Sequence, residues 1–177
     1  VIAKAMSNQM ALWLERKMGN KGGHIHNGMV KHITCDLNID YVKEAFVKVM
    51  KKHDALTLTF EEDDEVVLAR NNEVDANFFS FFEKEDKEAK QFIEDGLLAT
   101  MDLQNGPLFK VIVCKCGENN YYLGFGVHHI ISDAYSLYLI EHDFYQYYFE
   151  LIDGKKSKSN INSSYLETIL REREYLD

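Results

Sequence analysis

The sequence predicts an α/β fold: a mixed sheet flanked by helices in a two-layer α/β sandwich. Stretches that alternate apolar and polar residues, typical of strands, are interspersed with stretches in which apolar residues recur every three or four positions, typical of helices. At 177 residues the chain is long enough for one buried core. Because 46% of its residues are hydrophobic, we expect a single globular unit.

The first half of the chain contains two predicted helices and a strand. Residues 7–17 form the first predicted helix, ended by Gly19 and the Gly22-Gly23 pair, and residues 29–35 form a strand. The second helix is the clearest in the sequence, because five apolar residues share one face: Val42, Ala45, Phe46, Val49 and Met50.

Two strands and a helix follow. Residues 55–60 alternate apolar and hydroxyl side chains, and the acidic turn 61–65 leads into the strand at 66–69, which predicts a hairpin. Residues 83–100 carry most of their charge early and their apolar residues late. That pattern favours a helix whose first half faces solvent.

A second hairpin and a long helix complete the core. Residues 109–115 and 121–127 are apolar runs joined by a turn-rich segment, which predicts antiparallel strands. After a short loop, Leu137, Ile140, Phe144, Tyr147 or Tyr148, and Leu151 recur at helical spacing until Asp153-Gly154 breaks the pattern. The polar residues from 155 to 164 are predicted to form a linker.

Charge and composition exclude several classes of function. The net charge of −9 repels phosphate backbones and anionic lipids, so we expect no nucleic-acid partner. There is neither a long apolar run nor an N-terminal targeting pattern, so we expect no membrane association. Three cysteines, an odd and small number, favour reduced thiols and a cytoplasmic location. Both ends suggest a piece of a larger protein.

The segment with the most reactive side chains lies between the last predicted strand and the last predicted helix. His128 and His129 follow the strand, and Asp133 precedes the helix. Imidazole is suited to proton transfer near neutral pH, and consecutive residues on an extended backbone point in opposite directions. One histidine can therefore face a cavity while the other, with Asp133, holds the loop. A second interpretation stays open, in which both histidines are ordinary partly buried residues and Asp133 is the N-cap of the helix.

Two other clusters are alternatives for metal binding. Cys114 and Cys116 lie on one face of a predicted strand, but a second pair of thiolates is lacking. His24, His26 and His32 alternate along the chain without a nearby carboxylate or thiol. We therefore predict no metal site, and the sequence has neither a phosphate-binding glycine loop nor a nucleophile elbow.

The run His128-His129-Ile130-Ile131-Ser132-Asp133 resembles the His-His-x-x-x-Asp-Gly signature of condensation domains from nonribosomal peptide synthetases. Two further segments match the family in order and spacing: Lys-His-Asp-Ala-Leu-Thr-Leu-Thr-Phe at 52–60 resembles Arg-His-Glu-x-Leu-Arg-Thr-x-Phe, and Gln-Met-Ala-Leu-Trp at 9–13 resembles the opening motif. The segment around 102–108 is also similar. The chain departs from the family at Ala134, Lys52, Thr57 and Ala11.

The resemblance implies a chloramphenicol acetyltransferase-like fold, in which two lobes form a V around a tunnel that contains the active site. Residues 1–153 would be the N-terminal lobe. Residues 154–177 would be a linker and the start of the helix that leads to a C-terminal lobe, which this chain lacks. On this expectation the isolated chain is inactive.

The resemblance also implies an activity, amide-bond formation between a donor acyl thioester and an acceptor aminoacyl thioester. Both substrates would be attached to the phosphopantetheine arms of carrier proteins, with no cofactor bound directly. His129 would act on the acceptor amine, while His128 and Asp133 support the loop. In the family an arginine commonly pairs with the motif aspartate. The partner of Asp133 stays open here, and Lys52 is one candidate, although a lysine lacks the bidentate geometry of arginine.

Several alternatives remain on sequence grounds. The same motif resembles that of ester-forming acyltransferases and epimerization domains, and a noncatalytic lobe that docks carrier proteins is a third option. Carrier proteins are generally acidic, and Lys155, Lys156 and Lys158 form the one evident basic cluster that could bind them.

Overall fold

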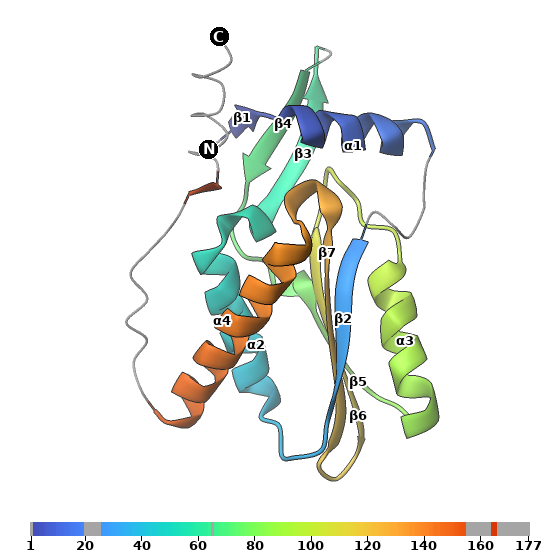
Figure 1. Ribbon diagram of the computed structural model, residues 1–177, viewed down its shortest axis with the longest axis vertical. Helices are drawn as coiled ribbons and strands as arrows, with labels where there is room; N and C mark the ends of the chain where they lie inside the picture. The colour runs from blue at the N-terminus through green and yellow to red at the C-terminus, as the bar shows by residue number, and fades with distance from the viewer. Residues whose placement is uncertain (1, 20–25, 65, 155–163, 166–177) are drawn as a thin grey trace.

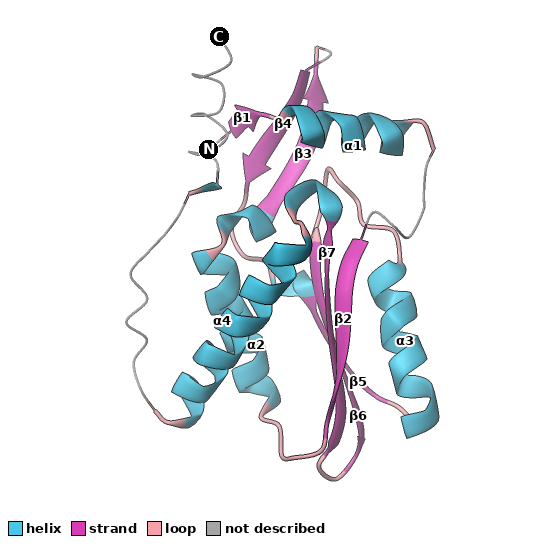
Figure 2. Ribbon diagram, viewed as in Figure 1, coloured by secondary structure: helices cyan, strands magenta, loops and turns pink. Residues whose placement is uncertain are grey.

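The computed structural model describes residues 2–19, 26–64, 66–154 and 164–165, and contains two sheets (Figure 1 and Figure 2). The larger sheet has the strand order β2-β7-β6-β5. Its strands are β2 (His26–Ile33), β5 (Phe79–Glu83), β6 (Phe109–Gly117) and β7 (Asn120–His128). Since β5 is parallel to β6 and the other pairs are antiparallel, the sheet is mixed, as predicted.

The smaller sheet is antiparallel, with the strand order β1-β4-β3, and lies beside helix α1 (Ser7–Lys17) at the top of Figure 1. Its strands are β1 (Ile2–Lys4), β3 (Leu58–Asp63) and β4 (Val66–Asn71). The predicted β3–β4 hairpin is confirmed, although β3 begins later than expected. The residues before β3 form a short 3-10 helix, η2 (Asp54–Thr57), in which the Thr57 hydroxyl donates to the Asp54 carbonyl (2.8 Å).

Helices cover both faces of the larger sheet. Helices α2 (Ile39–Lys52) and α4 (Ala134–Ile152) pack on one face, and α3 (Asp86–Leu98) packs on the other (Figure 2). The predicted α/β class is therefore confirmed. The larger sheet has helices on both faces instead of one, because α3 packs on the face opposite to α2 and α4. The five residues predicted to share one face of the second helix are the five buried residues of α2.

Glycines allow α3 to lie close to the sheet. A Cβ atom at Gly124 would fall 2.2 Å from Cγ2 of Ile93, and one at Gly126 would fall 3.2 Å from a Leu97 methyl group. Both glycines are on β7, the strand that ends at His128. The close packing of α3 therefore fixes the strand that carries the histidines.

Several differences from the sequence prediction have a common cause. Strands β1 and β5 are short and were not predicted, and β2 begins at His26 instead of residue 29. Each depends on pairing with a strand distant in the sequence, which local periodicity does not reveal.

The predicted linker lies almost entirely outside the described residues, so the boundary at residue 153 stays a prediction. Of the helices in the described part of the chain, none combines the length and apolar character needed to span a bilayer.

Candidate active site

The histidine loop joins β7 to α4 through a single 3-10 turn. Strand β7 ends at His128, the turn η4 covers His129–Ile131, and α4 starts at Ala134. The His128 side chain caps the turn, because its Nδ1 accepts a hydrogen bond from the Ile130 amide (3.1 Å). The Ser132 hydroxyl donates to the His128 carbonyl (3.0 Å). The loop is therefore held by its own side chains on both sides of His129.

His128 is a buried, neutral residue. Its side chain is 1% exposed, and its backbone amide donates to the Leu108 carbonyl (2.9 Å). Burial, reinforced by the positive charges that His26 and Arg16 can carry, lowers the pKa of His128 to about 3. An imidazole that accepts from Ile130 and stays unprotonated near neutral pH is suited to shaping the loop and not to exchanging protons.

His129 points the other way and is exposed. Its Nδ1 lies 2.7 Å from the Ser132 carbonyl oxygen, which can only accept, so Nδ1 carries the proton in this hydrogen bond. In the neutral ring Nε2 then bears the lone pair, and no described residue forms a hydrogen bond with Nε2. The loop thus presents an oriented proton acceptor to solvent. The opposite orientation of the two histidines follows the sequence prediction.

Asp133 is the N-cap of α4. Its carboxylate accepts hydrogen bonds from the Ser136 amide (2.8 Å) and the Ser136 hydroxyl (2.7 Å), and its own amide donates to that hydroxyl (3.1 Å). These hydrogen bonds from Ser136 lower the pKa of Asp133. The sequence allows two interpretations of Asp133, a residue that holds the loop and the N-cap of the helix. The structure is consistent with both, because the capping hydrogen bonds also hold the end of the loop against α4.

Lys52, the candidate partner of Asp133, pairs with a different carboxylate. Lys52 Nζ lies 2.8 Å from Oδ2 of Asp143, which is nearly three turns further along α4 and faces α2. His53 Nε2 lies 2.6 Å from the same oxygen. Burial alone would raise the pKa of Asp143, but the hydrogen bonds from Lys52 and His53 outweigh it and the net pKa is lowered.

Asp143 is not among the residues predicted to be important, although its position in the sequence indicates a buried charge. Asp143 is 3% exposed and falls on the apolar stripe of α4, next to Phe144. A charged residue within such a stripe indicates a buried ion pair. Here the pair joins α4 to the end of α2, and so fixes the helix that follows the histidine loop.

The two alternative metal clusters have other roles in the described residues. The His26 ring packs edge-on against His128, and His32 Nε2 lies 2.8 Å from the Asn120 side-chain oxygen at the other end of β2. His24 lies outside the described residues. Cys114 and Cys116 face α3, as the alternation predicted, and burial raises the pKa of the Cys114 thiol to about 11. Among the described residues, no three metal-binding side chains converge.

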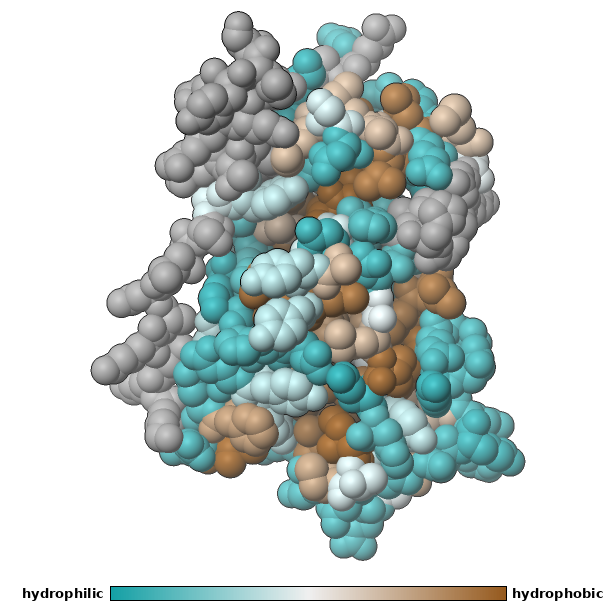
Figure 3. Space-filling view, viewed as in Figure 1, coloured by the Kyte–Doolittle hydropathy of each residue, from teal (hydrophilic) through white to brown (hydrophobic). Residues whose placement is uncertain are grey.

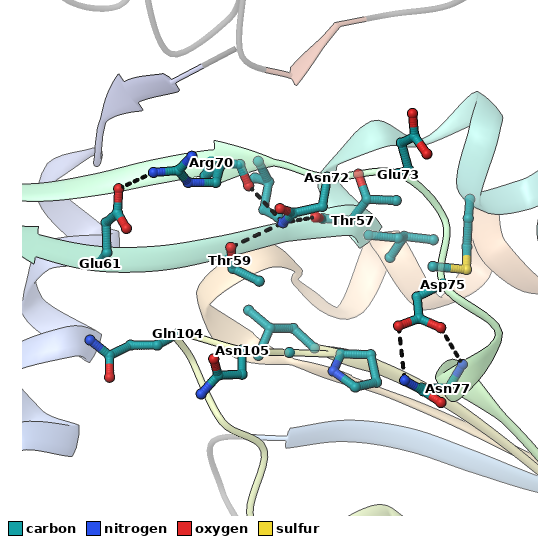
Figure 4. A pocket seen from close by; sticks show the side chains of 16 residues that line it. Thr57, Thr59, Glu61, Arg70, Asn72, Glu73, Asp75, Asn77, Gln104 and Asn105 are labelled. Carbon is teal, nitrogen blue, oxygen red and sulfur yellow. Dashed lines mark hydrogen bonds and ion pairs between the residues drawn. The ribbon is translucent and has the colours of Figure 1, made fainter.

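A polar pocket of about 370 Å³ lies elsewhere, between β3, β4 and the segment that precedes β6 (Figure 4). Most of its polar side chains are already paired: Arg70 with Glu61, Asn72 with Thr59 and Asn77 with Asp75. Residues of the histidine loop do not line it. The candidate reactive residue, His129, is thus on the exposed surface of the protein and not in this pocket.

A comparison with protein families identifies the family of the chain. The family model for the condensation domain matches residues 2–177. The chain belongs to the condensation domain family. His128 and His129, whose sequence resembles the family signature, lie at the end of β7 and the start of η4.

The similar curated proteins are large peptide synthetases. Bacitracin synthase 3 of Bacillus licheniformis is 29% identical over 139 residues, which is 75% of this chain and 2% of that protein. Surfactin synthase subunit 1 of Bacillus subtilis is 28% identical over 158 residues, or 84% of this chain and 4% of that protein. The chain therefore corresponds to a small part of each relative.

Solved structures confirm the fold. The starter condensation domain of rhizomide synthetase RzmA aligns over 99% of this chain and 46% of that chain, with a TM-score of 0.87 and 18% identity. The X-domain solved in complex with OxyB from teicoplanin biosynthesis aligns over 98% of this chain and 38% of that chain, with a TM-score of 0.89 and 16% identity. The expected chloramphenicol acetyltransferase-like fold is thus confirmed, and the chain spans less than half of each solved chain.

Proposed function

We propose that this chain is the N-terminal lobe of a condensation domain that joins a donor acyl thioester to an acceptor amine in nonribosomal peptide synthesis. The observation that carries the proposal is the orientation of His129. The Ser132 carbonyl accepts from Nδ1–H, and no residue in the described part of the chain forms a hydrogen bond with Nε2 of this exposed side chain. Such a group is suited to accept a proton or hydrogen bond from an incoming amine.

The proposed reaction needs modest help from the protein. The amine nitrogen bonds to the thioester carbonyl carbon, the carbon–sulfur bond breaks, and the amine proton is transferred to the departing sulfur. His129 Nε2 would accept that proton, or hold the amine and stabilise its developing positive charge. Because a thioester is already activated, holding the two groups together supplies much of the rate.

The other motif residues have supporting roles in this proposal. His128, buried and neutral, shapes the turn through its bond from Ile130, and Asp133 caps α4. Neither side chain would contact the substrate. The substrates would be carried on phosphopantetheine arms, in line with the solved RzmA domain in complex with C8-CoA and Leu-SNAC.

The exposure of His129 on the surface supports an arrangement in which a second lobe covers it. The surface over α4 and β2 in Figure 3 has pale and apolar side chains among the hydrophilic ones. Tyr135 and Tyr138, which follow the histidine loop, are 65% and 59% exposed. Exposed aromatic rings beside a reactive group are typical of a surface that another element covers. We propose that a C-terminal lobe completes the tunnel here, and that the isolated lobe is inactive.

The test uses a protein that carries this chain together with its second lobe. Loaded donor and acceptor carrier proteins are supplied, and transfer to the acceptor is followed by intact mass spectrometry. Product that forms with the wild type and falls at least about 100-fold in His129→Ala supports the proposal. Transfer that persists in His129→Ala contradicts the role of His129.

The same experiment separates the alternatives. Transfer to a hydroxyl acceptor instead of an amine would indicate an ester-forming acyltransferase, and exchange of the α-proton without transfer would indicate an epimerization domain. A noncatalytic docking lobe has one observation in its favour, because the network around Asp133 is also that of an ordinary helix cap. Carrier binding without any transfer across several acyl groups would favour it.

A further inference from the structure

Gln9 is a fully buried amide in α1, with 0% exposure. Its Nε2 donates to the Ile130 carbonyl (3.1 Å) and to the Tyr165 hydroxyl (3.3 Å), and its Oε1 accepts from the Met6 amide (3.0 Å). An apolar side chain would fill the same space without the cost of burying polar atoms. The amide is therefore explained by what it binds, which includes two residues far away in the sequence.

The first of these residues lies in the middle of the turn that carries His129. The Ile130 amide donates to His128 Nδ1, and its carbonyl accepts from Gln9. Both polar backbone groups of Ile130 are thus fixed by side chains. In a turn of three residues, fixing the central residue also fixes the backbone of its neighbour, and His129 then reaches the Ser132 carbonyl at 2.7 Å.

The second residue belongs to the segment that follows the lobe. The Tyr165 amide donates to Asp54 Oδ1 (2.8 Å), which lies in η2 at the end of α2. The Tyr165 hydroxyl also lies 3.6 Å from the Met6 sulfur. Gln9 therefore connects the histidine loop, 121 residues away in the sequence, with a segment 156 residues away that is also hydrogen-bonded to Asp54.

We propose that Gln9 is a positioning residue for His129, and that Tyr165 sets the orientation of the Gln9 amide. Gln9 does not touch the substrate: it holds the Ile130 carbonyl, and through it the Nδ1–H tautomer and the direction of His129 Nε2. The inference rests on the proposed function of His129. It adds that the segment at Tyr165, which leads out of the lobe, contributes to the geometry of the reactive loop.

The test compares three variants of the protein that carries both lobes. Gln9→Met keeps the size of the side chain and removes all three hydrogen bonds, Tyr165→Phe removes one bond of the Gln9 amide, and Gln91→Met makes the same change on the exposed surface of α3. We expect kcat to fall roughly 10- to 100-fold in Gln9→Met, because a small misplacement of a catalytic group costs that much. Tyr165→Phe should lower it by less, and KM for the loaded carriers should change less than about 3-fold in both variants.

A second measurement reports on His129 directly. In protein labelled with nitrogen-15 at histidine, the two ring nitrogens of His129 give signals that distinguish the Nδ1–H from the Nε2–H tautomer, and His129→Ala assigns them. We expect the Nδ1–H form in the wild type and in Gln91→Met, and a mixture in Gln9→Met. If Gln9→Met fails to fold, Gln9→Glu provides the test, since it keeps an acceptor for Met6 and loses the donor to Ile130.

Two results would overturn the inference. One is an unchanged tautomer together with an unchanged kcat in the folded Gln9 variant. The other is a loss of activity that merely follows the loss of folded protein, with kcat per folded molecule unchanged. Persistence of transfer in His129→Ala would instead reject the proposed function, and the tautomer comparison would still decide whether Gln9 orients the ring.

Discussion

The ring of His128 lies against that of His26 on the neighbouring strand, with the ring centroids 5.0 Å apart and the planes at 65°. The two residues face each other in the register of β2 and β7. Burial lowers the pKa of both rings, and for His128 to about 3. A proton on either ring would be poorly solvated and would repel a proton on the other, so the pair depends on staying neutral.

This pair predicts how stability depends on pH. The folded pKa of His128, about 3, is below its ordinary value of 6.5, so the unfolded chain binds the proton more strongly. Stability is therefore complete above pH 6.5 and decreases as the pH falls from 6.5 toward 3. His128 alone should reduce the free energy of unfolding by about 2 kcal/mol between pH 7 and 5.

Denaturant titrations of His128→Asn and His129→Asn at several pH values test this prediction. Asn keeps an acceptor for the Ile130 amide but does not titrate. The His128 variant should lose less stability than the wild type as the pH falls, while the variant of the exposed His129 should follow the wild type. Parallel curves for all three proteins would show that His128 is not the titrating group.

The buried carboxylate of Asp143 gives a second prediction. Asp143→Asn removes the acceptor charge between Lys52 and His53 and should lower the free energy of unfolding by about 2 kcal/mol at pH 7. The folded pKa of Asp143 is below its ordinary value, so its contribution is present above pH 4 and is lost as the pH falls below that value. The difference between wild type and variant should therefore shrink in acid.

Glu141→Gln on the same helix is the matched control, because Glu141 forms a partly exposed pair with Lys31. Such pairs contribute about 0.5 kcal/mol or less. Calorimetric or denaturant unfolding of both variants gives the comparison. Equal losses in the two variants would mean that the buried position of Asp143 has no special importance.

The approach of α3 to β7 predicts a steric effect. Gly124→Ala would place a methyl group 2.2 Å from Ile93 Cγ2, and that atom cannot rotate away easily because it is attached to the branched Cβ. We expect a loss of about 2 kcal/mol in the free energy of unfolding. Gly117→Ala, whose nearest contact would be 3.9 Å, should have little effect.

Ile93→Ala should rescue Gly124→Ala if the clash is the cause. In a double-mutant cycle the two substitutions together should then cost less than the sum of the single substitutions. Simple additivity would indicate that α3 adjusts its position without strain.

The lysine cluster near the end of the lobe remains a prediction from the sequence. Lys155, Lys156 and Lys158 lie outside the described residues, so the prediction rests on the sequence alone. Replacing all three with alanine should weaken binding of an acidic carrier protein about 3- to 10-fold at low salt. The same number of substitutions at Lys87, Lys90 and Lys84 on the α3 side provides the control, and equal affinity of both variants in a titration would remove the cluster from consideration.

Local patterns in the sequence predicted a large part of this molecule. The apolar spacing that fixes α2 and α4 is a property of neighbouring residues, and so is the turn-rich segment that joins β6 and β7. The order of two histidines after a strand was enough to predict that they point in opposite directions. Each of these features depends on residues less than about five positions apart, and the sequence displays them directly.

The tertiary structure decided which partner each reactive or buried group has. Only the tertiary structure shows that His128 is the buried, neutral ring beside His26, and only the contact between α2 and α4 pairs Lys52 with Asp143 instead of Asp133. Gln9 forms hydrogen bonds with Ile130, 121 residues away in the sequence, and with Tyr165, 156 residues away. Such contacts depend on how the chain closes on itself, because burial and hydrogen bonding are determined by neighbours in space and not by neighbours in sequence.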